Sequence, residues 1–351
     1  MSRVLVARLD SLGDVLLCGP AVRAIAASDE VDEVWMLCSA LGAEAARALP
    51  GVDEVLVWDC PWITATAPPA TAEHLARLDA LLRGLSVDAA VILTSFHQSP
   101  LPLALVLRLA GVPVITGASV DYAGTLLDVR LRPGEDFPED QPEPVRALGI
   151  AAAAGFVLPA DDDGRLRMRV AAPPPAELAG LGPYVVVHPG AAASARRWPA
   201  AAHAETVRLL DEAGVTVVVT GGPGERALTA EVSADGRHAL DLGGQTRLPV
   251  LAAILAGASA VVVGNTGPAH VAAAVGTPVV SLFSPVVPAA RWAPYGVEHV
   301  LLGDQDAPCA GSRARECPLP GHPCLASVRP TEIVDAVFTL APALAREEVG
   351  A

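Results

Sequence analysis

Two carboxylates follow the first hydrophobic segment of the chain. Asp10 and Asp14 flank the residues Ser11-Leu12-Gly13, directly after a predicted strand at 3–8. Gly13 permits a tight turn there, and Asp14 falls at the start of the helix that follows. An aspartate in this place either caps the helix or stands at the rim of a binding site, where its carboxylate takes a proton from a substrate. The turn is therefore a candidate for acid–base chemistry.

A turn in the second half of the chain has residue types that bind phosphate groups. It starts at His188-Pro189-Gly190, continues through small residues, and reaches Arg196-Arg197 just before a predicted helix. Small residues let the backbone come close to a ligand, and arginine matches phosphate oxygens with two hydrogen bonds. The alternative is a surface loop anchored by Trp198. We favour a phosphate site because the paired arginines stand directly before the helix.

A second turn of this kind, Gly264-Asn265-Thr266-Gly267-Pro268, joins a buried strand to a helix. Proline at the first helical position is typical of a helix start. The free N–H groups of the turn and the helix dipole form an anion site, but a well-capped helix with nothing bound has the same sequence. His270, in the first helical turn, is either a ligand contact or a hydrogen-bonded core residue.

Other motifs give weaker signals. A glycine-rich turn ends at Glu225, where a carboxylate is more often a helix-dipole partner than a ligand contact. Spacings in the group Cys309, Cys317, His322 and Cys324 fit no standard zinc pattern, so we expect structural thiols. The acidic residues at 161–163 and at 304 and 306 are expected in exposed loops. We therefore predict no metal site and no bound cofactor.

The elements that must position these turns alternate along the chain. Strands are predicted at 3–8, 33–38, 54–58, 89–94, 113–116, 184–188, 215–220, 260–263 and 278–283, with helices between them that include one at 13–27. This alternation predicts parallel sheets wound on both faces, in which ligands bind where helix N-termini face strand ends. A Pro- and Asp-rich linker at 159–176 separates two α/β domains, 1–165 and 176–330. Residues 331–351 form a last helix that could pack back on the N-terminal domain.

Composition excludes several classes of protein. Hydrophobic residues make up 52% of the 351 residues and charged residues 18%, so global disorder is excluded. A net charge of −15 disfavours a nucleic-acid binder and a standing contact with anionic membranes. Residues 1–175 carry 13 arginines against 23 acidic residues, a net charge of −10, which disfavours a polyanionic substrate there. Without a long apolar run or a signal-peptide pattern, we expect a cytoplasmic protein with reduced cysteines.

Taken in order, the motifs resemble glycosyltransferase family 9, the ADP-heptose:lipopolysaccharide heptosyltransferase family. The likeness covers nearly the whole chain and rests on the opening segment 4–15, on 188–190 with 196–199, and on the turns at 221–226 and 241–246. Its most specific part is the segment 265–274, and 317–325 resembles the family's tail. The resemblance implies a GT-B fold, with two Rossmann-like domains facing across a cleft. The acceptor would bind the N-terminal domain and the nucleotide-sugar the C-terminal one.

The resemblance also implies an inverting, metal-independent transfer of a sugar, which would be heptose because the family uses ADP-heptose. It implies roles for single residues as well. Asp14 would be the catalytic base. The nucleotide and its phosphates would contact a set drawn from four turns, namely Gly190, Arg196, Glu225, Leu242, Thr266, Gly267 and Pro268. The sugar would contact Asn265 and His270. Candidates on the acceptor side are Asp10, Ser11, Gly13, His97 and Gln98.

Three departures from the family pattern bear on the acceptor and the sugar. Asn265 stands where the family usually has Asp, Asp10 stands where it often has Ser, and the first half is acidic where lipopolysaccharide enzymes usually carry basic patches. We therefore expect a soluble, uncharged or cationic acceptor, such as a glycoside of a specialised metabolite, and a monomer or weak dimer. The alternatives are a lipopolysaccharide or cell-surface heptosyltransferase, a nucleotide-sugar epimerase on the same fold, and a nucleotide-sugar binding protein without turnover.

Overall fold

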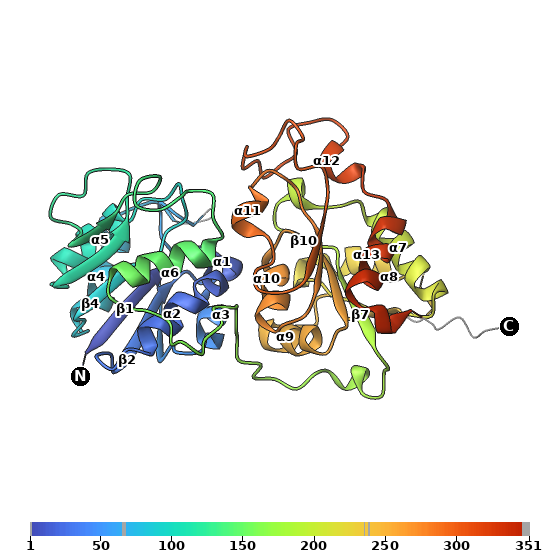
Figure 1. Ribbon diagram of the computed structural model, residues 1–351, viewed down its shortest axis with the longest axis horizontal. Coiled ribbons are helices and arrows are strands. Elements are labelled where there is room, and N and C mark those ends of the chain that lie inside the picture. Colours follow the sequence, from blue (N-terminus) through green and yellow to red (C-terminus); the bar gives the residue numbers. More distant parts are fainter. Residues whose placement is uncertain (1, 65–67, 235, 238, 346–351) are drawn as a thin grey trace. The chain divides into compact units, whose positions relative to one another are not determined.

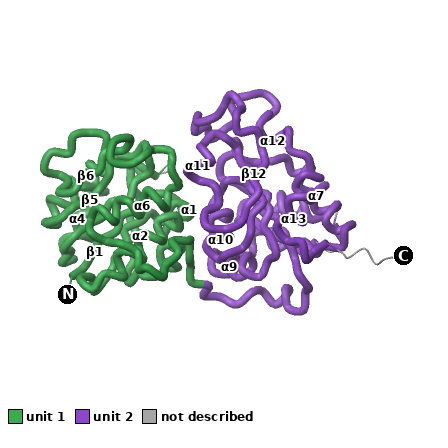
Figure 2. Tube along the Cα trace, in the orientation of Figure 1, with its two compact units in different colours: residues 1–169 green, residues 170–351 purple. Residues whose placement is uncertain are grey.

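The computed structural model describes residues 2–64, 68–234, 236–237 and 239–345. The chain divides into two compact units, residues 1–169 and 170–351 (Figure 2). This division falls inside the predicted linker 159–176, and each unit has one parallel sheet of its own.

The first unit is a six-stranded parallel sheet covered by helices (Figure 1). The strand order is β3-β2-β1-β4-β5-β6, with the bounds β1 (Arg3–Arg8), β2 (Glu33–Cys38), β3 (Glu54–Val57), β4 (Ala89–Ile92), β5 (Val114–Ala118) and β6 (Val129–Leu131). Leu5 and Ala7 of β1 pack in one core cluster with α4 (Ala72–Arg83) and α5 (Leu101–Leu109). The other helices of the unit are α1 (Leu12–Leu17), α2 (Gly19–Ala26), α3 (Ala43–Ala48) and α6 (Glu143–Ala153).

Two features of the first unit differ from the sequence-based prediction. The helix expected at 13–27 is interrupted at Cys18, because Pro20 in the first turn of α2 has no N–H to continue the hydrogen bonds of α1. The acidic residues 161–163 are not all solvated, since Arg23 donates hydrogen bonds of 2.7 and 2.9 Å to the two carboxylate oxygens of Asp162. These hydrogen bonds lower the pKa of Asp162 to about 2.

The second unit repeats the same architecture. Its strand order is β12-β11-β10-β7-β8-β9, with the bounds β7 (Tyr184–His188), β8 (Thr216–Val219), β9 (Ala239–Asp241), β10 (Ala260–Gly264), β11 (Val279–Leu282) and β12 (His299–Leu302). The helices are α7 (Ala200–Glu212), α8 (Arg226–Ser233), α9 (Leu248–Ala256), α10 (Gly267–Ala274), α11 (Ala289–Trp292), α12 (Pro323–Ala326) and α13 (Pro330–Leu340). The central strands are continuous apolar runs, as expected for parallel strands buried on both faces.

The last helix belongs to the second unit. Ile333 and Val337 of α13 are buried in the same core cluster as Val262 and Val280 of the sheet, and α13 packs along α7. The apolar spacing of three and four residues places Ile333, Ala336 and Val337 on one helix face, which the sheet covers. The structure thus packs this helix on the sheet of the second unit, and residues 346–351 lie outside the described part.

Each sheet has one position where the strand order reverses. In the first unit β1 lies between β2 and β4, and in the second β7 lies between β8 and β10. Parallel sheets bind ligands outside the carboxyl ends of the strands at such a switch point. The turns after β1, β7 and β10 are those that the sequence picks out for chemistry. Among the described residues, no helix combines the length and the apolar character needed to cross a membrane.

Candidate functional site

A buried arginine collects three carboxylates at the switch point of the first unit. Arg8, the last residue of β1, is 2% exposed, and its Nη2 lies 2.9 Å from Asp10 and 3.3 Å from Asp14. Its Nη1 lies 3.2 Å from the carboxylate of Glu143, the first residue of α6. Burial alone would lower the pKa of Arg8, but the negative charges around it hold that pKa well above its ordinary value. Arg8 is therefore a fixed positive charge.

Asp10 is the more enclosed of the two carboxylates that the sequence picks out. One oxygen forms an ion pair with Nη2 of Arg8, and the other accepts a 3.0 Å hydrogen bond from the side-chain amide of Gln98. Burial raises the pKa of Asp10 to about 6, against the opposing effect of Arg8. Both oxygens of the Asp10 carboxylate are thus already engaged, one in an ion pair and the other in a hydrogen bond.

Asp14 lies at the more open side of the cluster. The N-cap residue of α1 is Ser11, and Asp14 is the third residue of the helix. Its side chain is 23% exposed, against 11% for Asp10, and its second oxygen accepts a 2.7 Å hydrogen bond from the exposed hydroxyl of Ser11. A carboxylate that is anchored by Arg8 yet reaches solvent is suited to take a proton from a bound hydroxyl group.

The remaining acceptor-side candidates fall into two groups. Gln98 joins the cluster, since it donates to Asp10 and accepts a 3.0 Å hydrogen bond from the backbone N–H of Ser95. Gly13 is buried within α1 next to Asp14. His97 is exposed, and its ring contacts Phe96 edge-on at 4.8 Å. The structure therefore brings Asp10, Asp14 and Gln98 together, while His97 lies on the surface beside them in sequence.

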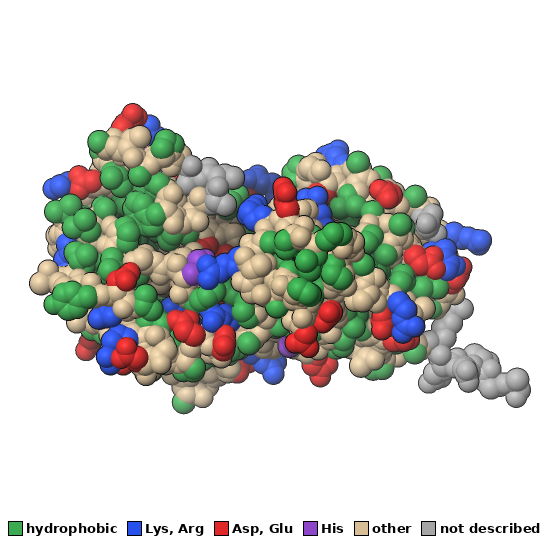
Figure 3. All heavy atoms as spheres, turned by 90° about the horizontal axis from the view of Figure 1, so that it is seen from above, with side chains coloured by type: hydrophobic (Ala, Val, Ile, Leu, Met, Phe, Trp, Pro, Cys, Tyr) green, Lys and Arg blue, Asp and Glu red, His purple; other side chains and the backbone are tan. Residues whose placement is uncertain are grey.

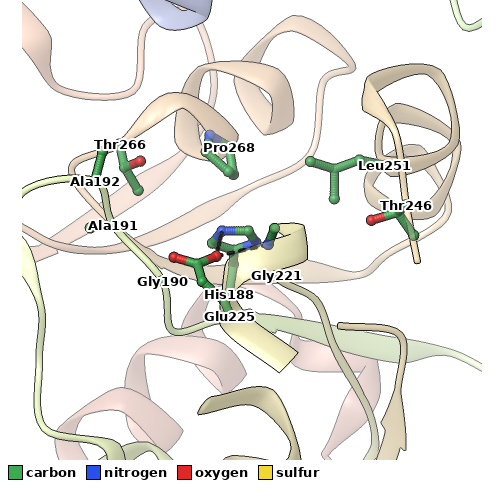
Figure 4. Close-up of a pocket in the computed structure, with 11 residues that line it drawn as sticks. His188, Gly190, Ala191, Ala192, Gly221, Glu225, Thr246, Leu251, Thr266 and Pro268 are labelled. Atoms are coloured by element: carbon green, nitrogen blue, oxygen red, sulfur yellow. Dashed lines mark hydrogen bonds and ion pairs between the residues drawn. The ribbon is translucent and has the colours of Figure 1, made fainter. Parts of the chain in front are cut away.

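A second site lies at the switch point of the other unit. A pocket of about 250 Å³ is lined by residues from the turns after β7, β8, β9 and β10 and from α9, namely His188, Gly190, Ala191, Ala192, Gly221, Gly222, Glu225, Thr246, Leu251, Thr266 and Pro268 (Figure 4). Gly190, Glu225, Thr266 and Pro268 were predicted from the sequence. The others were not, although His188 and Thr246 stand in the same motifs.

The floor of the pocket is a histidine–glutamate pair. Figure 4 shows the carboxylate of Glu225 directed at the imidazole of His188, whose Nε2 lies 4.0 Å from Oε2. Nδ1 of His188 shares a 3.0 Å hydrogen bond with the hydroxyl of Thr220, and the carboxylate of Glu225 accepts a 2.8 Å hydrogen bond from the N–H of Gly222. Burial lowers the pKa of His188 to about 4, against the effect of Glu225, so the imidazole is neutral at pH 7. The pocket therefore offers a carboxylate that accepts hydrogen bonds from hydroxyl groups.

Arg196 lies beside this pocket, next to the turn that begins α10. Its Nη1 donates a 3.2 Å hydrogen bond to the backbone carbonyl of Asn265. The backbone of the two segments is also in close contact, because a Cβ at Gly264 would stand 2.9 Å from the carbonyl oxygen of Arg196. The two turns predicted to bind phosphate are thus neighbours in space, although 69 residues separate Arg196 from Asn265.

The side chain of Asn265 is occupied by the backbone of the second unit. Its amide nitrogen donates a 3.1 Å hydrogen bond to the carbonyl of Ser284, and its amide oxygen accepts a 3.3 Å hydrogen bond from the N–H of the same residue. An aspartate could accept from that N–H but could not donate to the carbonyl. The Asn265 side chain, 5% exposed, therefore holds the turn after β10 to the end of β11.

Three other predicted residues, Leu242, Gly267 and His270, lie near the pocket but are not among the described residues that line it. Leu242 is 3% exposed and donates its N–H to Val219, so it holds the turn after β9. Gly267 begins α10, beside Thr266 and Pro268, and His270 is buried in the first turn of that helix.

The cysteine-rich segment braces the loop that carries Arg196. His322 contacts the carbonyl of Ala195 at 2.9 Å through Nε2, and Trp198 donates 3.0 Å to the carbonyl of Leu325. Cys309 and Cys324 are buried free thiols, and Cys317 is half-buried. Across the described ranges, no three His, Cys, Asp or Glu side chains are grouped so that they could hold a metal ion.

Comparisons with known proteins agree with this arrangement. The family model of glycosyltransferase family 9 (heptosyltransferase) matches residues 101–322. Lipopolysaccharide heptosyltransferase 1 of Pseudomonas aeruginosa is 29% identical over 346 residues, which cover 90% of this chain and 87% of the relative.

Solved structures show the same fold over the full length. The glycosyltransferase family 9 structure from Veillonella parvula has a TM-score of 0.76 at 17% identity and covers 97% of both chains. The E. coli heptosyltransferase WaaC, solved with ADP-2-deoxy-2-fluoro heptose, has a TM-score of 0.72 at 19% identity, with 96% of this chain and 99% of that chain covered. The predicted GT-B fold is confirmed, and the chain belongs to glycosyltransferase family 9 and is a glycosyltransferase.

Proposed function

We propose that this glycosyltransferase moves a heptose from ADP-heptose to a hydroxyl group of an acceptor, with inversion at the anomeric carbon and without a metal ion. The observation that carries the proposal is the pocket at the β7–β10 switch point, which brings Glu225, Thr266 and the neighbouring Arg196 to one place. The names of the relatives, a lipopolysaccharide heptosyltransferase and a heptosyltransferase solved with an ADP-heptose analogue, support the donor.

The pocket residues divide by chemistry over the parts of a nucleotide-sugar. Glu225 accepts hydrogen bonds only, so it suits the ribose hydroxyls and repels phosphate. Leu251 offers an apolar surface to the base (Figure 4). The diphosphate is assigned to Arg196 and to the start of α10 at Thr266 and Gly267, since helix N-termini and arginine both bind phosphate. His270 remains our candidate for the sugar.

The proposed reaction is a single displacement. The acceptor hydroxyl oxygen forms a bond to the anomeric carbon on the face opposite the diphosphate, its proton passes to the carboxylate of Asp14, and ADP leaves with the electron pair of the broken bond. Asp14 is suited to this because Arg8 and Ser11 orient it while it stays partly exposed. The charge that develops on ADP would be stabilised by Arg196 and the helix start, which is why no metal ion is needed.

For the acceptor we propose a soluble, uncharged or cationic molecule such as a glycoside. The first unit carries 13 arginines, no lysine and 23 acidic residues. Apolar side chains are also exposed on the face of the first unit that Figure 3 shows. In the same unit Tyr122 is 87% exposed and Val120 69% exposed. Such a surface does not suit a phosphorylated acceptor. The second candidate is a lipopolysaccharide acceptor, which the name of the Pseudomonas aeruginosa relative favours.

Two measurements test the proposal. A thermal-shift panel of ADP, UDP and GDP should show stabilisation by ADP, of about 2.7 kcal/mol at 100 times its dissociation constant. Incubation with ADP-heptose should then release ADP only when a hydroxyl acceptor is added. A changed donor sugar without any acceptor would support a nucleotide-sugar epimerase instead, and ADP binding without turnover on any acceptor would support a binding protein.

A further inference from the structure

The first residue of α6 joins the buried cluster around Arg8 in a way that the proposed reaction does not use. Glu143 is 2% exposed, and its Oε2 accepts from Arg8 Nη1 at 3.2 Å and from the hydroxyl of Ser95 at 2.9 Å. Ser95 in turn accepts 2.8 Å from Arg8 Nη2. Nη1 of Arg8 is therefore held by Glu143, while Nη2 contacts Ser95, Asp10 and Asp14.

These contacts close into a ring of three hydrogen bonds and one ion pair. The backbone N–H of Ser95 donates to Gln98, Gln98 donates to Asp10, and Asp10 pairs with Arg8, which returns to Ser95. Glu143 contacts two members of this ring, Arg8 and Ser95. The hydrogen bonds of a buried polar network keep its members in one geometry, although Nε of Arg8 has no hydrogen-bond partner among the described residues. Asp14 takes part in it through the shared Nη2 of Arg8.

We propose that Glu143, together with Ser95, is a positioning residue of this glycosyltransferase, which acts on Asp14 through the guanidinium of Arg8. This inference rests on the proposed function, in which Asp14 takes the proton of the acceptor. Glu143 has two effects in it. It fixes the position of the Arg8 guanidinium. It also reduces the stabilisation that the positive charge of Arg8 gives to the carboxylates of Asp10 and Asp14.

The sign of the electrostatic effect follows from the charged groups that face Arg8. They are Asp10 after β1, Asp14 of α1, and Glu143 and Arg146 of α6. The thiol of Cys18 also faces Arg8, but burial raises its pKa to about 12, so it is neutral at pH 7. Removing the charge of Glu143 leaves Arg8 to be shared by two carboxylates instead of three. Their ionised forms then become more favourable, so the pKa of Asp10 and of Asp14 should fall.

The test compares Glu143→Gln with Glu139→Gln. Glutamine keeps an oxygen that can accept from Ser95 but removes the charge. Glu139 is a matched control, because its substitution removes the same charge nearby, from a carboxylate that pairs with Arg146 at 3.4 Å. The pKa of Asp10 is about 6 in the wild type and can be followed by carbon NMR of the Asp carboxyl groups, assigned with Asp10→Asn. We expect it to fall by about one pH unit in Glu143→Gln and to stay unchanged in Glu139→Gln.

The rate supplies a second readout. The acidic limb of the pH profile of kcat/KM should move to lower pH in Glu143→Gln by a similar amount. Glu143→Asp keeps the charge, so the acidic limb of its pH profile should stay at the wild-type pH even if kcat falls. Ser95→Ala should lower kcat without shifting this limb. A merely structural role would lower the melting temperature of Glu143→Gln and leave the titration of Asp10 where it is.

A folded Glu143→Gln protein with an unchanged Asp10 titration would overturn the positioning role. If Glu143→Gln does not fold, Glu143→Asp and Ser95→Ala decide the matter, because unchanged kcat in both would equally overturn it. Failure of the proposed function has a different signature. Asp14→Asn would then keep its turnover, while the NMR comparison, which needs no acceptor, would still report on Glu143 and Asp10.

Discussion

The α-carbon of Gly190 lies against the carboxylate of Glu225. A Cβ at position 190 would stand 2.1 Å from Oε1 of Glu225, far inside van der Waals contact. Since Glu225 also accepts from the N–H of Gly222, the turns after β7 and β8 meet at one carboxylate on the floor of the pocket (Figure 4). The absence of a side chain at position 190 is what allows Glu225 to point into the pocket.

We therefore expect Gly190→Ala to displace Glu225 and to weaken ADP binding by about tenfold or more, the loss of one good hydrogen bond to a charged group. Isothermal calorimetry with ADP measures this. Gly224→Ala is the matched control. Gly224 precedes Glu225 in the same turn, and a Cβ at this position would meet nothing within 4 Å. Equal ADP affinity in Gly190→Ala and the wild type would remove Glu225 from the nucleotide site.

Arg196→Ala should weaken ADP binding by about 1.5–3 kcal/mol, since hydrogen bonds to charged groups fall in this range. Arg208→Ala, an exposed arginine of α7 paired with Glu205 and Glu212, serves as the control and should bind ADP like the wild type. Calorimetry at the same ionic strength compares the three proteins. An Arg196→Ala protein with wild-type affinity would show that the diphosphate is held elsewhere.

Transfer should proceed in the presence of EDTA at the wild-type rate, because Arg196 and the start of α10 are expected to stabilise the leaving diphosphate. The rate is measured as ADP release with and without the chelator, and again after magnesium or manganese is added. Activity that EDTA abolishes and either ion restores would contradict the proposed mechanism. It would also direct attention to Asp304 and Asp306, the acidic pair after β12.

Two buried histidines should make the second unit less stable in acid. Burial lowers the pKa of His203 to about 3 and that of His188 to about 4. Each group then binds its proton more weakly in the folded state, so its stability contribution is complete above about pH 6.5 and is lost as the pH falls toward the folded pKa. The expected slope is about 1.4 kcal/mol per pH unit for each histidine below pH 6.

His203→Phe isolates one of these contributions. Nδ1 of His203 has no hydrogen-bond partner among the described residues, and the ring packs edge-on against Trp198 at 4.9 Å. Phenylalanine keeps that contact and removes both the buried nitrogen and the titration. Urea unfolding at pH 7, 5.5 and 4.5 should show a smaller loss of stability in the variant than in the wild type. Parallel curves for the two proteins would contradict the account of His203.

Much of the fold follows from local patterns in the sequence. The strands at 3–8, 33–38 and 184–188 have the predicted bounds, because each is a short apolar run between turn residues. The α6 helix was not predicted. It follows a segment rich in proline and acidic residues. One of its faces is buried against α2, and the residues on that face show no clear helical periodicity in the sequence.

The candidate sites were predictable only where they lie on turns directly after strands. Asp10, Asp14 and Thr266 follow strand ends, and parallel sheets bring such ends to one edge. Glu143 reaches Arg8 across 135 residues, and no local pattern indicates that contact. Asn265 was assigned to the sugar from sequence, but its pairing with Ser284 depends on the ends of β10 and β11 lying side by side.

The central claim is that Asp14 takes the proton of the acceptor in a transfer from ADP-heptose, and Asp14→Asn tests it most directly. A general base supplies about 10²–10⁴-fold of the rate, so turnover should fall by at least ~10² while calorimetric affinity for ADP stays near the wild-type value. Asp10→Asn is the comparison, and it should change the acceptor KM more than the rate. An Asp14→Asn protein that transfers heptose at close to the wild-type rate would contradict the account.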